Sequence, residues 1–151
     1  MKENPTKAFL NRYRYLVQRR ESLLRQIDII RARATSTSIP LKAVTVKSSA
    51  RIYDRMAEDA VTMADSTRLL DELVKEIDTA LTQILIAINQ VDDEKQRTVL
   101  TLRYVEGLPW EKIQHKLSYE HTQTMKLHGK ALLQVSAWLT AEERTKTDIN
   151  P

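Results

Sequence analysis

Apolar side chains recur at every third or fourth position over residues 5–34, which is the spacing of one face of a helix. The opposite face carries arginines, so this segment predicts an amphipathic helix whose apolar stripe needs a partner helix. The stripe consists of Tyr13, Leu16, Arg20, Leu23, Ile27, Ile30 and Ala34. The outer arginines are Arg12, Arg14, Arg19, Arg25, Arg31 and Arg33, and guanidinium groups suit phosphate and carboxylate equally well.

A second stripe of the same spacing runs without a break through residues 52–91 and predicts a helix roughly 60 Å long at 1.5 Å per residue. Its positions are Tyr53, Met56, Ala60, Met63, Thr67, Leu70, Val74, Ile77, Leu81, Ile84, Ile88 and Val91. Between the stripes, residues 35–51 hold Ser and Thr clusters and Pro40, so we expect a flexible connection there. The first helix can then fold back along the second as an antiparallel coiled-coil hairpin, or the same stripe can pair the long helices of two subunits in a homo-oligomer.

Three shorter helical patterns follow. Asp92, Asp93 and Glu94 interrupt the stripe and offer an N-cap to the next helix. The three apolar sets are Val99, Leu100 and Tyr104, then Trp110, Ile113 and Leu117, then Thr124, Leu127, Ala131 and Leu132. Gly107 suits the end of the first of these helices and Pro109 the start of the second. Residues 118–120 have the length of the turn in a helix-turn-helix.

We therefore predict an all-α protein with three parts. Residues 1–91 form the helical hairpin with its linker at 35–51, residues 92–139 form a helix-turn-helix domain, and residues 140–151, which lose the periodicity, form a flexible tail. The third helix of the domain is expected to span about 121–138.

Charge is unevenly distributed along the chain, although the net charge is only +4. Residues 1–51 hold 12 Lys or Arg and 3 Asp or Glu, residues 52–91 hold 3 and 8, and residues 92–151 hold 9 and 9. The basic first helix is therefore expected to face the acidic second one. The expected acidic partners are Asp54, Glu58, Asp59, Asp65, Asp71, Glu72, Glu76 and Asp78.

Several classes of protein are disfavoured. The chain has no Cys, so disulfides and thiolate chemistry are excluded. No apolar run approaches the ~20 residues that cross a bilayer, and the N-terminus lacks the apolar core of a signal peptide, so we expect a cytoplasmic protein without membrane contact. No Gly-rich phosphate loop or compact acid pair indicates an enzyme or a cofactor site. His121 and His128 would lie two turns, about 10 Å, apart, so we also expect no metal site.

Four sequence blocks carry a family resemblance: 97–100, 103–107, 110–113 and 127–132. They resemble region 4 of bacterial sigma factors, and more closely the small phage proteins similar to it, which include late-gene transcription regulators of the ArpU and RinA kind and a related streptococcal phage family. Ala34, Thr35 and Ser36, the basic linker and the second long helix also fit that group. The resemblance implies a phage or prophage regulator that binds double-stranded DNA in the bacterial host cell and contacts RNA polymerase.

By analogy with that pattern, the helix from His121 would enter the major groove of DNA. We predict that His121, Thr122 and Lys126 contact base edges, and that Lys116, Gln123 and Lys130 contact phosphates. Thr124, Leu127, Ala131 and Val135 are expected to face inward, with Met125 outward and His128 at the flank.

Three residues depart from the family pattern. Gln114 stands where a small residue is usual, Glu120 where Ser or Thr would cap the helix, and Thr124 where an aliphatic residue is expected. A buried polar group without a partner costs on the order of 1–3 kcal/mol, so Gln114 and Thr124 should find hydrogen bonds or the domain is loosened. Two alternatives stay open: a packaging protein of the small-terminase kind, which would assemble through the long helices into an oligomer, and a module that binds RNA polymerase or another regulator.

Overall fold

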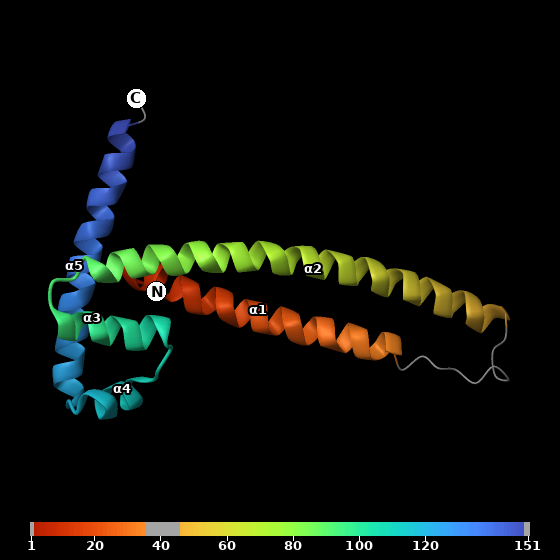
Figure 1. Ribbon diagram of the computed structural model, residues 1–151, viewed down its shortest axis with the longest axis horizontal. Coiled ribbons are helices and arrows are strands. Elements are labelled where there is room, and N and C mark those ends of the chain that lie inside the picture. The colour runs from red at the N-terminus through yellow and green to blue at the C-terminus, as the bar shows by residue number, and fades with distance from the viewer. Residues whose placement is uncertain (1, 36–45, 150–151) are drawn as a thin grey trace. The chain divides into compact units, whose positions relative to one another are not determined.

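The computed structural model describes residues 2–35 and 46–149. Within these ranges every regular element is a helix, so the expected all-α class is confirmed (Figure 1). The elements are α1 (Pro5–Thr35), α2 (Val46–Asn89), α3 (Glu94–Leu100), the π-helical turn η2 (Thr101–Val105), α4 (Trp110–Leu117) and α5 (His121–Ile149). None of the helices in the described ranges combines the length and the apolar character needed to cross a membrane.

The chain divides into two compact units. One combines Met1–Leu16 with Ile77–Pro151, and the other is Val17–Glu76. Helices α1 and α2 contribute residues to both units, so the division differs from the boundary at 91/92 that the sequence suggested.

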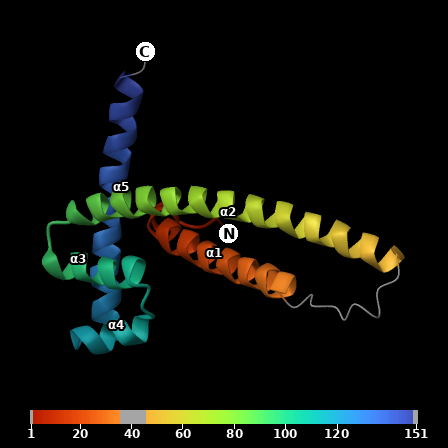
Figure 2. The ribbon, with the colours of Figure 1, turned by 45° about the vertical axis from the view of Figure 1, so that its right-hand side comes forward.

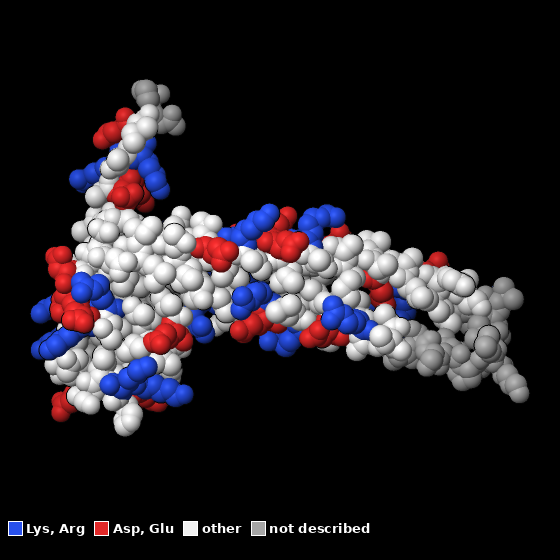
Figure 3. All heavy atoms as spheres, viewed as in Figure 1, with Lys and Arg blue, Asp and Glu red and all other residues white. Residues whose placement is uncertain are grey.

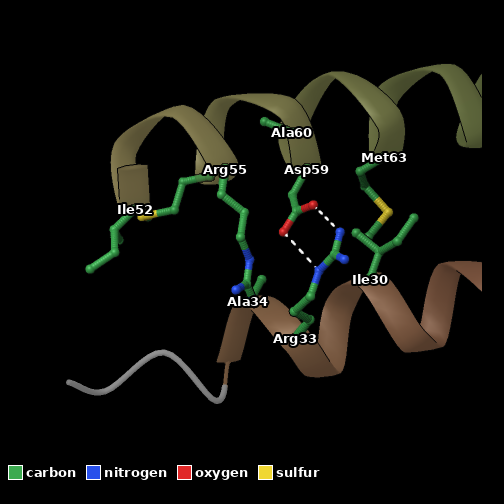
Figure 4. A pocket seen from close by; sticks show the side chains of 9 residues that line it. Ile30, Arg33, Ala34, Ile52, Arg55, Asp59, Ala60 and Met63 are labelled. Carbon is green, nitrogen blue, oxygen red and sulfur yellow. Dashed lines mark hydrogen bonds and ion pairs between the residues drawn. The ribbon is translucent and has the colours of Figure 1, made fainter. Parts of the chain in front are cut away.

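In the unit Val17–Glu76, the two helices run antiparallel (Figures 1 and 2). Val17, Leu23 and Ile27 of α1 and Leu73 of α2 are buried. Near the end of α1, Arg33 forms an ion pair with Asp59 of α2, and its Nε donates to Asp59 Oδ2 over 3.2 Å (Figure 4). The expected pairing of the basic and the acidic helix is thus found at Asp59.

Leu16, Leu23 and Ile27 of the predicted α1 stripe are buried, but Ala34 is exposed. In α2, Ile77, Ile84, Ile88 and Val91 are buried as expected, whereas Tyr53, Met56, Ala60 and Thr67 are exposed, so the prediction is wrong at those four positions. At two further positions the buried residue is shifted by one: Leu73 is 1% exposed while Val74, the predicted position, is 42% exposed. The correction continues along the helix, where Ala80 and Ala87 are buried.

Helix α2 begins at Val46, so the prediction of a linker through residue 51 is wrong for residues 46–51. Thr35, also assigned to the linker, belongs to α1. Residues 46–51 contain neither Gly nor Pro, and Ser and Thr oppose helix formation only weakly, so an established helix can extend through them. The rest of the predicted linker, residues 36–45, lies outside the described residues.

Helix α5 continues to Ile149, beyond the end predicted near Trp138, so the segment expected to be a flexible tail is helical as far as Ile149. Residues 140–149 are exposed and bury no apolar stripe, which is why the periodicity is lost. They include Ala141, Glu142, Glu143 and Arg144, all good helix formers, and adding a residue to an existing helix is far easier than starting one.

The unit Met1–Leu16 with Ile77–Pro151 has one continuous core, and α1 supplies part of it. Leu10 of α1 is fully buried among residues of α2, α3, η2 and α5. Full burial of such a side chain contributes about 1.5–3 kcal/mol. The core residues are Leu10, Ile84, Ala87, Ile88, Val91, Leu100, Tyr104, Ala131 and Val135.

Candidate nucleic-acid interface

The first helix of the C-terminal part starts where the acidic residues predicted a cap. Asp93 is the N-cap of α3, and its Oδ1 accepts a hydrogen bond of 3.1 Å from the backbone N–H of Lys95. This satisfies one of the donors that a helix leaves without a partner at its N-terminus. The carboxylate also suits the positive end of the helix dipole.

Between η2 and α4, the chain turns at Gly107. Its φ of +72° lies in the left-handed region, as the sequence predicted. The guanidinium of Arg14 lies against the same backbone, where a Cβ at position 107 would collide with it. Pro109 is the N-cap of α4, with extended backbone at φ −66° and ψ 154°. The positive φ favours glycine at position 107, and a Cβ there would also displace the end of the flexible Arg14 side chain.

Helices α4 and α5 are joined by residues 118–120, the three-residue connection that the sequence predicted. Ser118 takes the left-handed conformation at φ 54°, and the Tyr119 N–H donates to the Gln114 carbonyl over 3.0 Å. These contacts satisfy backbone groups at the end of α4.

The inward face of α5 differs in one position from the prediction. Thr124, Ala131 and Val135 are fully buried, as expected. Leu127 is only half-buried, and His128, which was placed at the flank, is 7% exposed. His128 therefore takes the place predicted for Leu127 on the inward face, between Thr124 and Ala131.

His128 packs where α5, α4 and η2 meet. Its Nε2 shares a hydrogen bond of 2.8 Å with the Tyr104 hydroxyl, and the Trp110 ring lies edge-on with centroids 4.7 Å apart. Burial, and then the charges of Lys7 and Arg103, lower the pKa of His128 from 6.5 to about 4. Burial raises the pKa of Tyr104 to about 12, so both groups are neutral at pH 7. His128 is thus a packing residue of the core.

The two unusual polar residues both have hydrogen-bond partners. The Gln114 side-chain amide donates to His121 Nδ1 over 2.9 Å, and Thr124 Oγ1 donates to the Glu120 carbonyl over 3.0 Å. Of the two outcomes left open by the sequence, hydrogen bonding of Gln114 and Thr124 is the one that the structure shows. Because Nδ1 of His121 accepts, a neutral His121 carries its proton on Nε2 and can still donate from it.

All six residues predicted to contact DNA are exposed. Five of them lie within the first three turns of α5, and one lies in the last turn of α4. No acidic residue occurs between Glu120 and Glu142. The six residues are Lys116, His121, Thr122, Gln123, Lys126 and Lys130.

Charge elsewhere on the surface is mixed. In the view of Figure 3, Lys and Arg side chains lie next to Asp and Glu along the long helices. No group of three or more His, Asp or Glu side chains in the described ranges is arranged to hold a metal ion.

Three basic residues lie near the α3–α4 connection, and the sequence did not group them. Arg14 was expected on the outer face of its helix, but the structure half-buries it against Gly107. Arg14 lies against Gly107, Arg103 lies over the Trp110 ring at 4.7 Å from its centroid, and Lys7 is close enough to lower the pKa of His128. Lys7 and Arg14 precede Arg103 by some 90 positions, so no local pattern could have grouped them.

Comparison of the chain with protein-family models, with curated protein sequences and with solved structures found no match in any of the three.

Proposed function

We propose that this protein is a phage or prophage transcription regulator that binds double-stranded DNA with α4 and α5, used as a helix-turn-helix like that of sigma factor region 4. One observation carries the proposal. The first turns of α5 expose His121, Thr122, Gln123, Lys126 and Lys130, while Thr124, His128 and Ala131 of the same turns are buried. Action at late-gene promoters, and contact with RNA polymerase, follow from the sequence resemblance and belong to the same proposal.

The chemistry of that face supports DNA as the partner. Amide, hydroxyl and imidazole groups can donate to base edges in the major groove, and ammonium groups neutralise phosphates. Lys116 sits at the end of α4, beside the connection to α5, where a phosphate contact would fix the position of α5. The absence of acids through residue 141 removes the main source of repulsion along the helix.

His121 has a defined role in this proposal. Its hydrogen bond to Gln114 links the end of α4 to the start of α5 and fixes the ring before DNA arrives. A fixed donor loses less conformational entropy on binding than a free one. Gln114, at the position where the family pattern has a small residue, thereby orients the side chain that we expect to contact a base.

The test is selection of binding sequences from a pool of random DNA duplexes, followed by affinity measurements on the selected and a scrambled duplex across a salt series. We expect a preferred sequence to emerge. A variant with His121→Ala and Lys126→Ala should lose most of the preference, since a good base contact contributes about 1–3 kcal/mol of discrimination.

A matched control lies on the same helix. Lys146→Ala with Thr147→Ala also removes one lysine and one polar side chain from an exposed face of α5. This control should retain the sequence preference. Failure to enrich any sequence, or equal binding by the His121 and Lys126 variant, would refute the proposal. Capture of RNA polymerase without DNA affinity would favour the protein-binding alternative, and ring assembly would favour the packaging alternative.

A further inference from the structure

We infer that Lys7 and Arg14 of α1, together with Arg103, form a second DNA-binding patch that holds a backbone phosphate at the N-terminal end of α4. The inference rests on the proposed function, because it names a second contact with the same partner. It makes the N-terminal helix part of the DNA-binding surface.

Helix geometry places the two α1 residues beside the C-terminal part of their unit. Leu10 is fully buried in the shared core, so the face of α1 that carries it points at α3, η2 and α5. Lys7 precedes Leu10 by three positions and Arg14 follows it by four, so all three lie on one face of the helix. Lys7 and Arg14 therefore lie on either side of buried Leu10. Their long side chains can reach from there to the surface of the C-terminal part of the unit.

The contacts of the three residues agree with this placement. Arg14 lies against Gly107 in the α3–α4 connection, and Arg103 donates to the Leu108 carbonyl over 3.1 Å while its guanidinium covers the Trp110 ring. Lys7 and Arg103 both act on the pKa of His128, which packs against Trp110. Arg14 and Arg103 thus border the start of α4, and Lys7 is near enough to act on His128, which packs against Trp110 of that helix.

Its cations are available to a ligand. Among the residues that the structure describes, neither Lys7, Arg14 nor Arg103 forms an ion pair. Lys7 is exposed, and Arg14 and Arg103 are half-buried. The acidic groups of the same surroundings are Glu3, whose charge acts on Tyr104, the exposed Glu106 beside Gly107, and the exposed Glu111 in the first turn of α4.

The length of α4 would place a phosphate bound at its N-terminal end next to the groove that α5 would enter. Helix α4 has eight residues, so its ends are roughly 12 Å apart. That is about the width of the major groove of B-DNA. The predicted base-contacting residues follow the C-terminal end of α4, and Arg14 and Arg103 of the patch border its N-terminal end, so the patch can meet the backbone that borders the groove.

The experiment compares the salt dependence of binding to a fluorescein-labelled duplex of mixed sequence. The slope of log affinity against log salt falls by about 0.9 for every phosphate that the protein no longer neutralises. Because the patch holds one phosphate, Lys7→Gln with Arg14→Gln should reduce the magnitude of the slope by about 0.9, and Lys7→Gln alone by a part of that amount. The single variant removes only an exposed side chain, so it keeps the test valid if the Arg14 substitution disturbs folding.

The control is Arg25→Gln with Arg31→Gln. It removes the same net charge from exposed positions of the same helix in the unit Val17–Glu76. We expect its slope to match that of the native protein. Equal slopes for the Lys7 variants and this control, with native binding intact, would overturn the patch and leave the proposed function standing. Absence of DNA binding by the native protein would refute both.

Discussion

At the scale of single residues, the two glycines of the chain should respond in opposite ways to replacement by alanine, because the space that a Cβ would occupy differs between them. Gly107 has a positive φ and the Arg14 guanidinium where its Cβ would be. Gly129 lies in α5 with nothing within 4 Å of the position that a Cβ would take. Alanine is therefore strained at the first position and unhindered at the second.

We expect Gly107→Ala to lower the free energy of unfolding by about 1–2 kcal/mol, the penalty of the left-handed conformation, while the flexible end of Arg14 moves aside. Gly129→Ala should raise it by about 0.5–1 kcal/mol, because alanine restricts the unfolded chain and favours the helix. Urea unfolding followed by circular dichroism measures both. Changes of the same sign would show that the surroundings assigned to the two glycines are wrong.

His128 gives the molecule a stability that depends on pH. Above pH 6.5, the imidazole is neutral in both the folded and the unfolded chain, so folding does not have to bury a charged ring or remove its proton. Below that value the unfolded chain binds a proton that folded His128 does not bind until about pH 4. Stability is therefore lost as pH falls from 6.5 to 4, by up to about 3 kcal/mol at 1.36 kcal/mol for each pKa unit.

Carboxylates also titrate in acid, so the prediction is a difference between two proteins. The double variant His128→Leu, Tyr104→Phe removes both partners of the buried hydrogen bond and leaves no polar group unpaired. Its stability should fall less steeply than that of the native protein between pH 6.5 and 4. Parallel curves would contradict the buried, neutral state of His128.

At the scale of elements, periodicity predicted that helices form and roughly where, but not the register of α2. Leu73 and Val74 are adjacent and both apolar, as are Ala80 and Leu81. A stripe through either member of each pair keeps the alternation of three and four, so the sequence cannot choose between them. Which member of each pair is buried depends on the packing of α2 against its neighbouring helices.

This register leads to a prediction about neighbouring residues. Leu73→Ala should lower the free energy of unfolding by about 2–4 kcal/mol, because it opens a cavity at a position that is 1% exposed. Val74→Ala, at 42% exposure, should cost under about 1 kcal/mol. Thermal and urea unfolding of the two variants distinguish the positions. A larger decrease at Val74 would restore the register expected from the sequence.

The candidate site was predictable where its residues are close in sequence. The left-handed Gly107, the cap at Asp93 and the connection 118–120 each follow from a few adjacent residues. The burial of His128 and the position of Arg14 depend on elements that are distant in sequence. Long-range packing decides those features, and a single sequence contains no local pattern that reports it.

At the scale of the whole molecule, the boundary between 91 and 92 cuts through a core. Val91 and Leu100 lie on opposite sides of it and both belong to the cluster around Leu10. A chain that begins at residue 92 would expose the apolar faces of α3 and α5, which in the intact unit cover residues of α1 and α2. Residues 92–151 should therefore need the first helix in order to fold.

Two proteins test this dependence. The fragment 92–151 should unfold without a cooperative transition, and Leu10→Ala should destabilise the full chain by about 2–5 kcal/mol, since Leu10 is fully buried. Tyr15→Ala is the control on the same helix, because Tyr15 is 67% exposed and should change stability by under about 0.5 kcal/mol. A sharp, two-state transition in the fragment would instead establish residues 92–151 as an independent domain.

The dependence also bears on the proposed phosphate patch, because a core that requires Leu10 keeps Lys7 and Arg14 beside residues 92–151 whenever those residues are folded.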